Sequence, residues 1–113
     1  MKTPTGGCHC GAVRYQVETD LAQVLVCNCS HCHKKGMLLN FVDKDKFKLL
    51  QGAENLQEYL INKKAIRHLF CKTCGVQSFA EGITFPKACI NVRCLDEVNV
   101  DALTLTPFNG KDL

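Results

Sequence analysis

The spacing of its cysteines constrains this chain more than any other feature, since nine of its 113 residues are cysteine. Seven of them fall in short groups, at Cys8-His9-Cys10, at Cys27-Asn28-Cys29-Ser30-His31-Cys32 and at Cys71-Lys72-Thr73-Cys74. Cysteines two residues apart form strained disulfides with each other, whereas they readily bind a common metal ion. The number is odd and no export signal is visible, so the pattern favours metal binding over a disulfide framework or unrelated buried thiols.

Length and composition predict one soluble domain over residues 1–113. Hydrophobic residues make up 46% and charged residues 22%, which is ordinary for a globular protein. The longest apolar runs are far shorter than the roughly 20 residues that span a bilayer, and the first residues offer no apolar stretch for a signal peptide. We therefore expect a cytoplasmic protein without a membrane partner.

The basic character of the sequence is weak evidence for nucleic-acid binding. The formal net charge is +3, but seven thiolates holding two zinc ions would contribute −3 and cancel it. The lysines and arginines are also scattered rather than arranged in a stripe. We expect no nucleic-acid partner.

Short alternating runs of apolar and polar residues predict a mainly β domain. Gly6-Gly7 and other turn signals separate them, and no stretch of ten residues has a helical period, although 53–59 could form a helical turn or two. The segment 98–113 is expected to be strand or coil. The expected strands are 13–17, 24–27, 38–42, 47–50, 56–61, 65–70, 76–80 and 88–93. Such a small sheet protein has a modest core, so zinc would act as a staple.

Two cysteine pairs flank expected strands. Cys8 and Cys10 precede a strand, and because residues i and i+2 of an extended chain face the same way, both thiolates point to one place. Cys71 and Cys74 follow a strand, and Gly75 can take the positive φ of a zinc-knuckle turn. A Cys-x-x-Cys pair is also typical of thioredoxin-like redox sites, but these need a following helix, which the sequence does not predict.

Together, Cys8, Cys10, Cys71 and Cys74, here termed the four-cysteine group, predict one closed tetrahedral zinc site. A site without an open position is structural. Sixty residues separate its two pairs, so metal binding is expected to be coupled to folding.

The remaining cluster, Cys27, Cys29 and Cys32, is here termed the three-cysteine group. Three protein ligands and one exchangeable position are typical of a catalytic zinc. Water or an added thiol is the expected fourth ligand. The alternatives are closure by a nearby histidine or by a distant cysteine, either of which would make the site structural; the candidates are His31, His33, Cys89 and Cys94.

Histidines next to the three-cysteine group are candidate proton carriers at neutral pH. His31 and His33 hold these positions, with a solvent-facing or supporting role as the alternative. His9 stands between two expected ligands and is read as structural, and His68 as an ordinary sheet residue. Cys89 and Cys94 have no partner at chelating spacing and are expected to be buried apolar filler.

The order and spacing of the seven clustered cysteines resemble the glutathione-dependent formaldehyde-activating enzyme family. The resemblance is carried by the segments 8–15, 27–32 and 70–75, by Phe79, and by 91–96, and it covers about residues 6–96. The same domain occurs in centromere protein V.

The resemblance implies a β-tent fold of several small coiled antiparallel sheets. It places a structural zinc in the four-cysteine group and a second, catalytic-type zinc in the three-cysteine group. The activity it implies is that of a carbon–sulfur lyase acting on a glutathione adduct of formaldehyde, S-hydroxymethylglutathione.

Glutathione carries two carboxylates, so its binding needs cationic or N–H groups. Lys34 and Lys35 follow the three-cysteine group and Arg93 adjoins Cys94, which makes them candidates, although solvated surface charge is the alternative for each. The rival to the enzyme hypothesis is a zinc-stapled β module that binds a partner protein and catalyses nothing.

Overall fold

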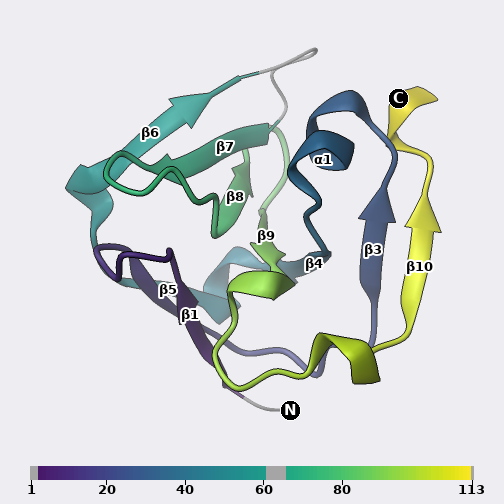
Figure 1. Cartoon of the computed structure of the whole chain (residues 1–113), viewed down its shortest axis with the longest axis horizontal. Helices are drawn as coiled ribbons and strands as arrows, with labels where there is room; N and C mark the ends of the chain where they lie inside the picture. Colours follow the sequence, from purple (N-terminus) through teal and green to yellow (C-terminus); the bar gives the residue numbers. More distant parts are fainter. Residues whose placement is uncertain (1–2, 61–65, 113) are drawn as a thin grey trace.

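The structure is a computed structural model that describes residues 3–60 and 66–112. Strands dominate it (Figure 1). The strands are β1 (Thr5–Gly7), β2 (Arg14–Val17), β3 (Val24–Cys27), β4 (Leu39–Asp43), β5 (Phe47–Gln51), β6 (Leu56–Tyr59), β7 (Ile66–Cys71), β8 (Phe79–Gly82), β9 (Lys87–Asn91) and β10 (Leu105–Phe108). The helices are α1 (Ser30–Lys35) and the 3-10 turns η1 (Lys44–Lys46), η2 (Ala53–Asn55), η3 (Val92–Cys94), η4 (Val100–Ala102) and η5 (Gly110–Asp112).

These strands form two sheets. A three-stranded sheet has the order β1-β2-β5, and a seven-stranded sheet has the order β10-β3-β4-β9-β8-β7-β6. The mainly β class is confirmed. Pairing is antiparallel except between β10 and β3, which are parallel and lie side by side in Figure 1, a departure from the expected antiparallel sheets.

The main core lies where alternating strand residues face inward. In β2 the polar residues are half-buried while Tyr15 and Val17 are fully buried, as period-two alternation requires. The Tyr15 ring packs against Phe47 and Phe79 at centroid distances of 5.1 and 5.7 Å. Its hydroxyl donates to the Ser78 carbonyl at 2.9 Å, so the core also satisfies its polar group.

A second apolar cluster surrounds the three-cysteine group. Cys27 and Cys32 pack there with Leu25, Met37 and other side chains, and Ala80 and Cys89 supply the far side from β8 and β9. This cluster fixes the position of α1 next to the end of β3.

Two elements differ from the sequence-based expectation. Gly6 and Gly7, read as a turn, lie in β1, where a Cβ on Gly7 would lie 2.0 Å from the Val13 carbonyl oxygen. These glycines permit close strand approach rather than a turn. The helix α1 was not predicted, because its six residues are too short to display a helical period.

The remaining boundaries shift by a few residues. β8 begins at Phe79 rather than 76, β9 ends at Asn91, and 92–94 form the turn η3. The expected turn within 53–59 is η2 alone, followed by β6, and the expected strand ends at 61 and 65 lie outside the described residues. The segment 98–113 supplies η4, β10 and η5, so it contributes a strand as well as irregular structure.

The segment after β9 is fastened to the amino-terminal strands. Asp96 pairs with Arg14 and accepts a hydrogen bond from the Thr5 hydroxyl at 2.9 Å. The Arg14 guanidinium holds the pKa of Asp96 below its usual range.

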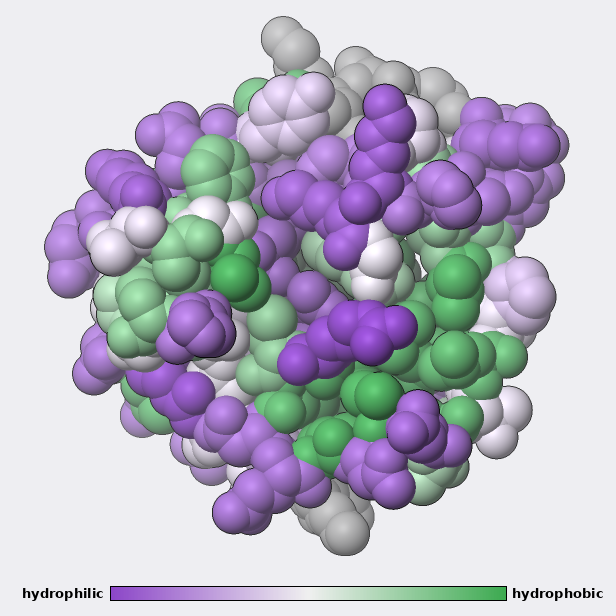
Figure 2. Space-filling view, in the orientation of Figure 1, coloured by the Kyte–Doolittle hydropathy of each residue, from purple (hydrophilic) through white to green (hydrophobic). Residues whose placement is uncertain are grey.

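The outer surface of the β3–β10 pair is partly apolar. Val26 and Leu105 are 40% and 44% exposed, and Figure 2 shows apolar residues gathered over these strands. Among the described residues, no helix is long and apolar enough to cross a membrane.

Candidate functional site

The four-cysteine group converges from two turns that are far apart in sequence. All four sulfur atoms lie within 4.8 Å of one another. The Sγ atom of Cys10 lies 3.6 Å from the Sγ atoms of Cys8 and Cys71. A tetrahedral ion with Zn–S bonds of about 2.3 Å would separate its sulfurs by about 3.8 Å. These four thiols therefore fit a closed four-thiolate zinc site.

Backbone N–H groups in the second of these turns favour thiolates. The N–H groups of Cys74 and Thr73 lower the pKa of Cys71 to about 6. The Asn55 amide also donates to the Cys71 Sγ atom at 3.1 Å. Gly75 closes the turn at a φ of 80°, a left-handed conformation suited to glycine. These donors stabilise the thiolate form of Cys71, which is the form that binds metal.

The three-cysteine group is built at the junction of β3 and α1. Cys27 is the last residue of β3, Cys29 is the N-cap of α1, and Cys32 lies in its first turn. The Cys29 Sγ atom accepts the Cys32 N–H at 3.3 Å, in place of the oxygen of an ordinary N-cap. At the other end, Gly36 takes the left-handed conformation that stops the helix.

The three sulfurs also lie within 4.8 Å of one another. In the described parts of the chain, no histidine, aspartate, glutamate or further cysteine joins them at that distance. Burial raises the pKa of Cys27 and of Cys32. Burial also acts on Cys29, but N–H donors led by that of Cys32 outweigh it and lower its pKa. Three thiols without a fourth protein ligand among the described residues fit a zinc ion with an exchangeable fourth position.

The two candidate proton carriers have different surroundings. His33 is exposed, whereas both ring nitrogens of His31 are buried and have no hydrogen-bond partner among the described residues. The His31 ring lies 4.1 Å from the His68 ring and 5.5 Å from the Tyr59 ring, measured between centroids. Burial, with a smaller contribution from the charge of Lys35, lowers the pKa of His31.

His68 and Gln77 extend this polar contact, and sequence reasoning missed both. The Nδ1 atom of His68 lies 2.9 Å from the Gln77 amide nitrogen, whose side-chain oxygen accepts from Lys35 at 2.8 Å. Burial lowers the pKa of His68 to about 4, so the ring is neutral at pH 7. No spacing signal marks these residues, because they meet only when α1, β7 and the segment before β8 pack together.

The candidate glutathione-binding residues gather at the carboxyl end of α1. Arg93 donates through Nε to the Gly36 carbonyl at 3.0 Å. Lys34 is exposed, and the Lys35 ammonium lies 5.4 Å from the centre of the Phe70 ring as well as on Gln77. The structure thus brings these three cationic side chains to one helix end.

The other cysteines and His9 lie outside both groups. Cys89 is buried beside the three-cysteine group, and burial raises its pKa to about 12. The Cys94 thiol contacts the Gln77 carbonyl at 3.8 Å, and burial raises its pKa to about 11. His9 is exposed in the turn between two thiols. Neither cysteine closes the three-cysteine group.

The comparisons with known proteins agree with this arrangement. The family model described as glutathione-dependent formaldehyde-activating enzyme matches residues 3–107. The chain belongs to this family. A crystal structure of a Rhodobacter sphaeroides protein, a structural genomics target, superposes with a TM-score of 0.82 at 33% identity. That match covers 91% of this chain and 97% of the other.

Membership of the glutathione-dependent formaldehyde-activating enzyme family covers both cysteine groups and Arg93. It supports a lyase-type role connected with glutathione at the level of the family. The resemblance inferred from the cysteine order is thereby confirmed.

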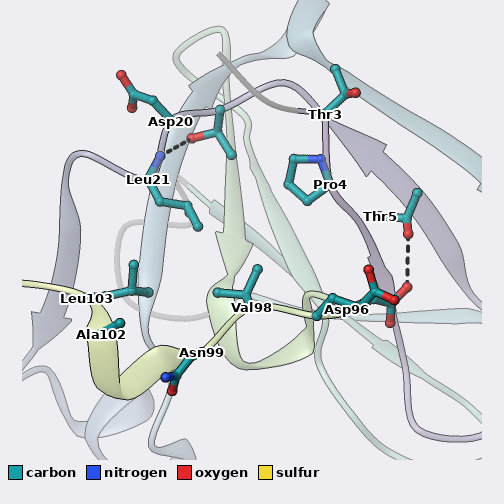
Figure 3. A pocket seen from close by; sticks show the side chains of 12 residues that line it. Thr3, Pro4, Thr5, Asp20, Leu21, Asp96, Val98, Asn99, Ala102 and Leu103 are labelled. Carbon is teal, nitrogen blue, oxygen red and sulfur yellow. Dashed lines mark hydrogen bonds between the residues drawn. The ribbon is translucent and has the colours of Figure 1, made fainter.

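An open hollow of about 900 Å³ lies away from this site, between β1 and the segment 96–103 (Figure 3). Leu21, Val98 and Leu103 form part of its apolar wall, and Asp96 lies at its edge. None of the described residues that line it is a cysteine or a histidine. The hollow therefore adds nothing to the metal chemistry of the two cysteine groups.

Proposed function

We propose that this protein catalyses the reversible joining of glutathione and formaldehyde at the three-cysteine group, as a zinc-dependent carbon–sulfur lyase. The observation that carries the proposal is the convergence of three thiols from β3 and α1 with no described fourth side chain. Family membership supports the same chemistry. The four-cysteine group would hold a second, structural zinc, and the nine free thiols favour a reducing, cytoplasmic setting.

The reaction adds a thiol across a carbonyl group. The sulfur forms a bond to the formaldehyde carbon, the C=O bond becomes a C–O single bond, and the thiol proton ends on that oxygen. A zinc ion held by the three-cysteine group would lower the pKa of the incoming thiol and so supply the thiolate nucleophile. The reverse direction breaks the same C–S bond.

We assign the proton transfer to His31 rather than His33. Its buried ring nitrogens have no hydrogen-bond partner within residues 3–60 and 66–112, so one can accept a proton from the thiol and return it to the oxygen. The lowered pKa keeps the ring neutral and able to accept at neutral pH. His33 is exposed and lies on the solvent side of α1, so we give it no part in the reaction.

The carboxyl end of α1 provides the charge that would recognise glutathione. Lys34 and Arg93 are exposed there, and the Lys35 ammonium is directed to Gln77. A peptide carboxylate would therefore meet Lys34 and Arg93 first, with Arg93 offering its remaining N–H donors. This arrangement would place the substrate thiol toward the amino end of the helix, where Cys29 and Cys32 lie.

The test is exchange-spectroscopy NMR of ¹³C-formaldehyde with glutathione at equilibrium, where enzyme accelerates exchange beyond the spontaneous rate. Wild-type protein should accelerate exchange, and Cys29→Ser should abolish the acceleration. Cys94→Ser is the matched control, since it removes a thiol outside both groups and should leave the rate unchanged. Exchange at the spontaneous rate in the presence of zinc-loaded wild-type protein would overturn the proposal.

A further inference from the structure

The carboxyl-terminal residues cover the three-cysteine group from one side. β10 runs parallel to β3, with Phe108 in register with Cys27. The chain then turns through η5, and Gly110 faces the cluster. A Cβ atom built on Gly110 would lie 2.3 Å from the Cys27 Sγ atom and 3.6 Å from the Cys29 Cβ atom. Only glycine allows the backbone to approach the sulfur so closely.

Asn28 holds this cover in place. It stands between two of the thiols, and its own N–H donates to the Phe108 carbonyl at 3.1 Å. Its side-chain amide donates to the Asn109 side-chain oxygen at 2.9 Å, and its side-chain oxygen accepts the Lys111 N–H at 3.0 Å. All three of these Asn28 groups therefore form hydrogen bonds with the segment 108–112.

The segment 108–112 and the strand before it are mostly exposed. β10, which leads into the segment, is an edge strand of the seven-stranded sheet, and all four of its residues are exposed. Elements with few buried apolar contacts and exposed hydrogen bonds open at a lower free-energy cost than the core. The match to the family model ends at residue 107 and so does not include the segment.

We propose that the segment 108–112 is a gate on the three-cysteine group, and that Asn28 is the positioning residue that keeps it closed. This inference rests on the proposed function, in that the gate controls the access of a glutathione-sized thiol to the three sulfurs. While closed, the segment leaves Cys27 buried beneath Gly110. Opening requires the two side-chain hydrogen bonds of Asn28 to break.

The test measures alkylation of Cys27 by iodoacetamide, followed by peptide mass spectrometry. The protein carries one equivalent of zinc per chain, so that the four-cysteine group keeps the fold. Loss of two hydrogen bonds changes an opening equilibrium by roughly tenfold, so Asn28→Ala should raise the Cys27 rate by about that factor. Asn99→Ala is the matched control, because Asn99 caps η4, and Cys94 is the internal reference within each chain.

Gly110→Val in the full chain provides a second arm if Asn28→Ala does not fold, because a Cβ atom at this position would lie 2.3 Å from the Cys27 Sγ atom. It should show at least the same rise at Cys27 with an unchanged rate at Cys94. A rise below threefold at Cys27 in the folded variants, or an equal rise at Cys94, would overturn the gate. Because the assay contains neither glutathione nor formaldehyde, its result is independent of whether the protein catalyses their addition.

Discussion

Replacing Cys71 by serine should separate the structural from the local role of the two cysteine groups. Cys71 is buried, and its sulfur lies against the sulfur of Cys10, which is 61 positions away in the sequence. The variant loses a ligand that ties the amino-terminal hairpin to the middle of the chain. Cys29→Ser is the matched comparison, since its group lies within six consecutive residues.

Loop closure gives the size of the difference. In the chain-entropy description of cross-links, closing a 61-residue loop stabilises the folded state by about 4 kcal/mol, and closing a five-residue loop by about 2 kcal/mol. Small domains have a total stability of about 5–15 kcal/mol, so the first loss removes a large share of it. At roughly 4 °C per kcal/mol, loss of the long-range tie lowers Tm by about 16 °C.

The assay is thermal unfolding by circular dichroism, together with zinc content by mass spectrometry. Cys71→Ser should lose one zinc and melt at least about 16 °C below wild type, or fail to fold at 25 °C. Cys29→Ser should also lose one zinc but keep its secondary structure and fall by about half as much. A soluble Cys71→Ser chain with two zinc ions and the wild-type Tm would refute the reasoning. An equal fall in Tm in the two variants would refute it as well.

Three further predictions concern residues around the three-cysteine group. Burial depresses the pKa of His68 from 6.5 to about 4, so as pH falls the unfolded chain binds a proton at this residue before the folded chain does, and the contribution of the neutral ring to the free energy of unfolding is full above pH 6.5 and is lost as pH falls toward 4. The free energy of unfolding of His68→Gln should therefore depend less steeply on pH in this range, and identical slopes for variant and wild type would contradict this. Gly110→Val should raise Cys27 alkylation as Asn28→Ala does, because no side chain fits at 2.3 Å from that sulfur; an unchanged rate would count against the contact. Arg93→Gln should raise KM for glutathione by about tenfold, the scale of a lost charge-assisted hydrogen bond, without changing KM for 2-mercaptoethanol, which has no carboxylate; equal effects on both thiols would rule out carboxylate recognition.

The cysteine groups were the most predictable part of the molecule, for a local reason. Cys8 and Cys10 share one turn, and Cys71 and Cys74 share another, so their spacing alone indicates two thiols facing one point. That the turns meet is a tertiary fact, but four thiolates have few other uses in a chain of this kind. The mainly β class followed in the same way from local alternation in runs such as 13–17.

The helix α1 could not be predicted from periodicity, since it has fewer than two turns. Its caps carry the only sequence signal. Gly36 is a usual helix stop, whereas the N-cap acceptor is the Cys29 sulfur, which is not among the preferred capping side chains. Because Cys29 belongs to the metal-binding motif, the sequence does not mark it as the residue that begins the helix.

The remaining site residues depend on contacts between distant segments. His68 looks like any alternating strand residue. Its contact with His31 arises from the packing of β7 against α1, and its contact with Gln77 from the packing of β7 against the segment before β8. Asn28 and Gly110 meet through the parallel pairing of β10 with β3, which no local pattern encodes. Arg93 was a candidate by its charge and its place beside Cys94, and its bond to the Gly36 carbonyl is likewise a tertiary contact.

X-ray absorption at the zinc edge of the two-zinc protein, before and after saturation with glutathione, tests the central claim most directly. Zn–S bonds of about 2.3 Å are distinguishable from Zn–N bonds of about 2.0–2.1 Å. With one four-thiolate and one three-thiolate ion, the average should rise from about 3.5 to about 4 sulfurs per zinc when the glutathione thiol enters the open position. A spectrum that already requires a histidine nitrogen and does not change at saturating glutathione would contradict a catalytic three-cysteine site.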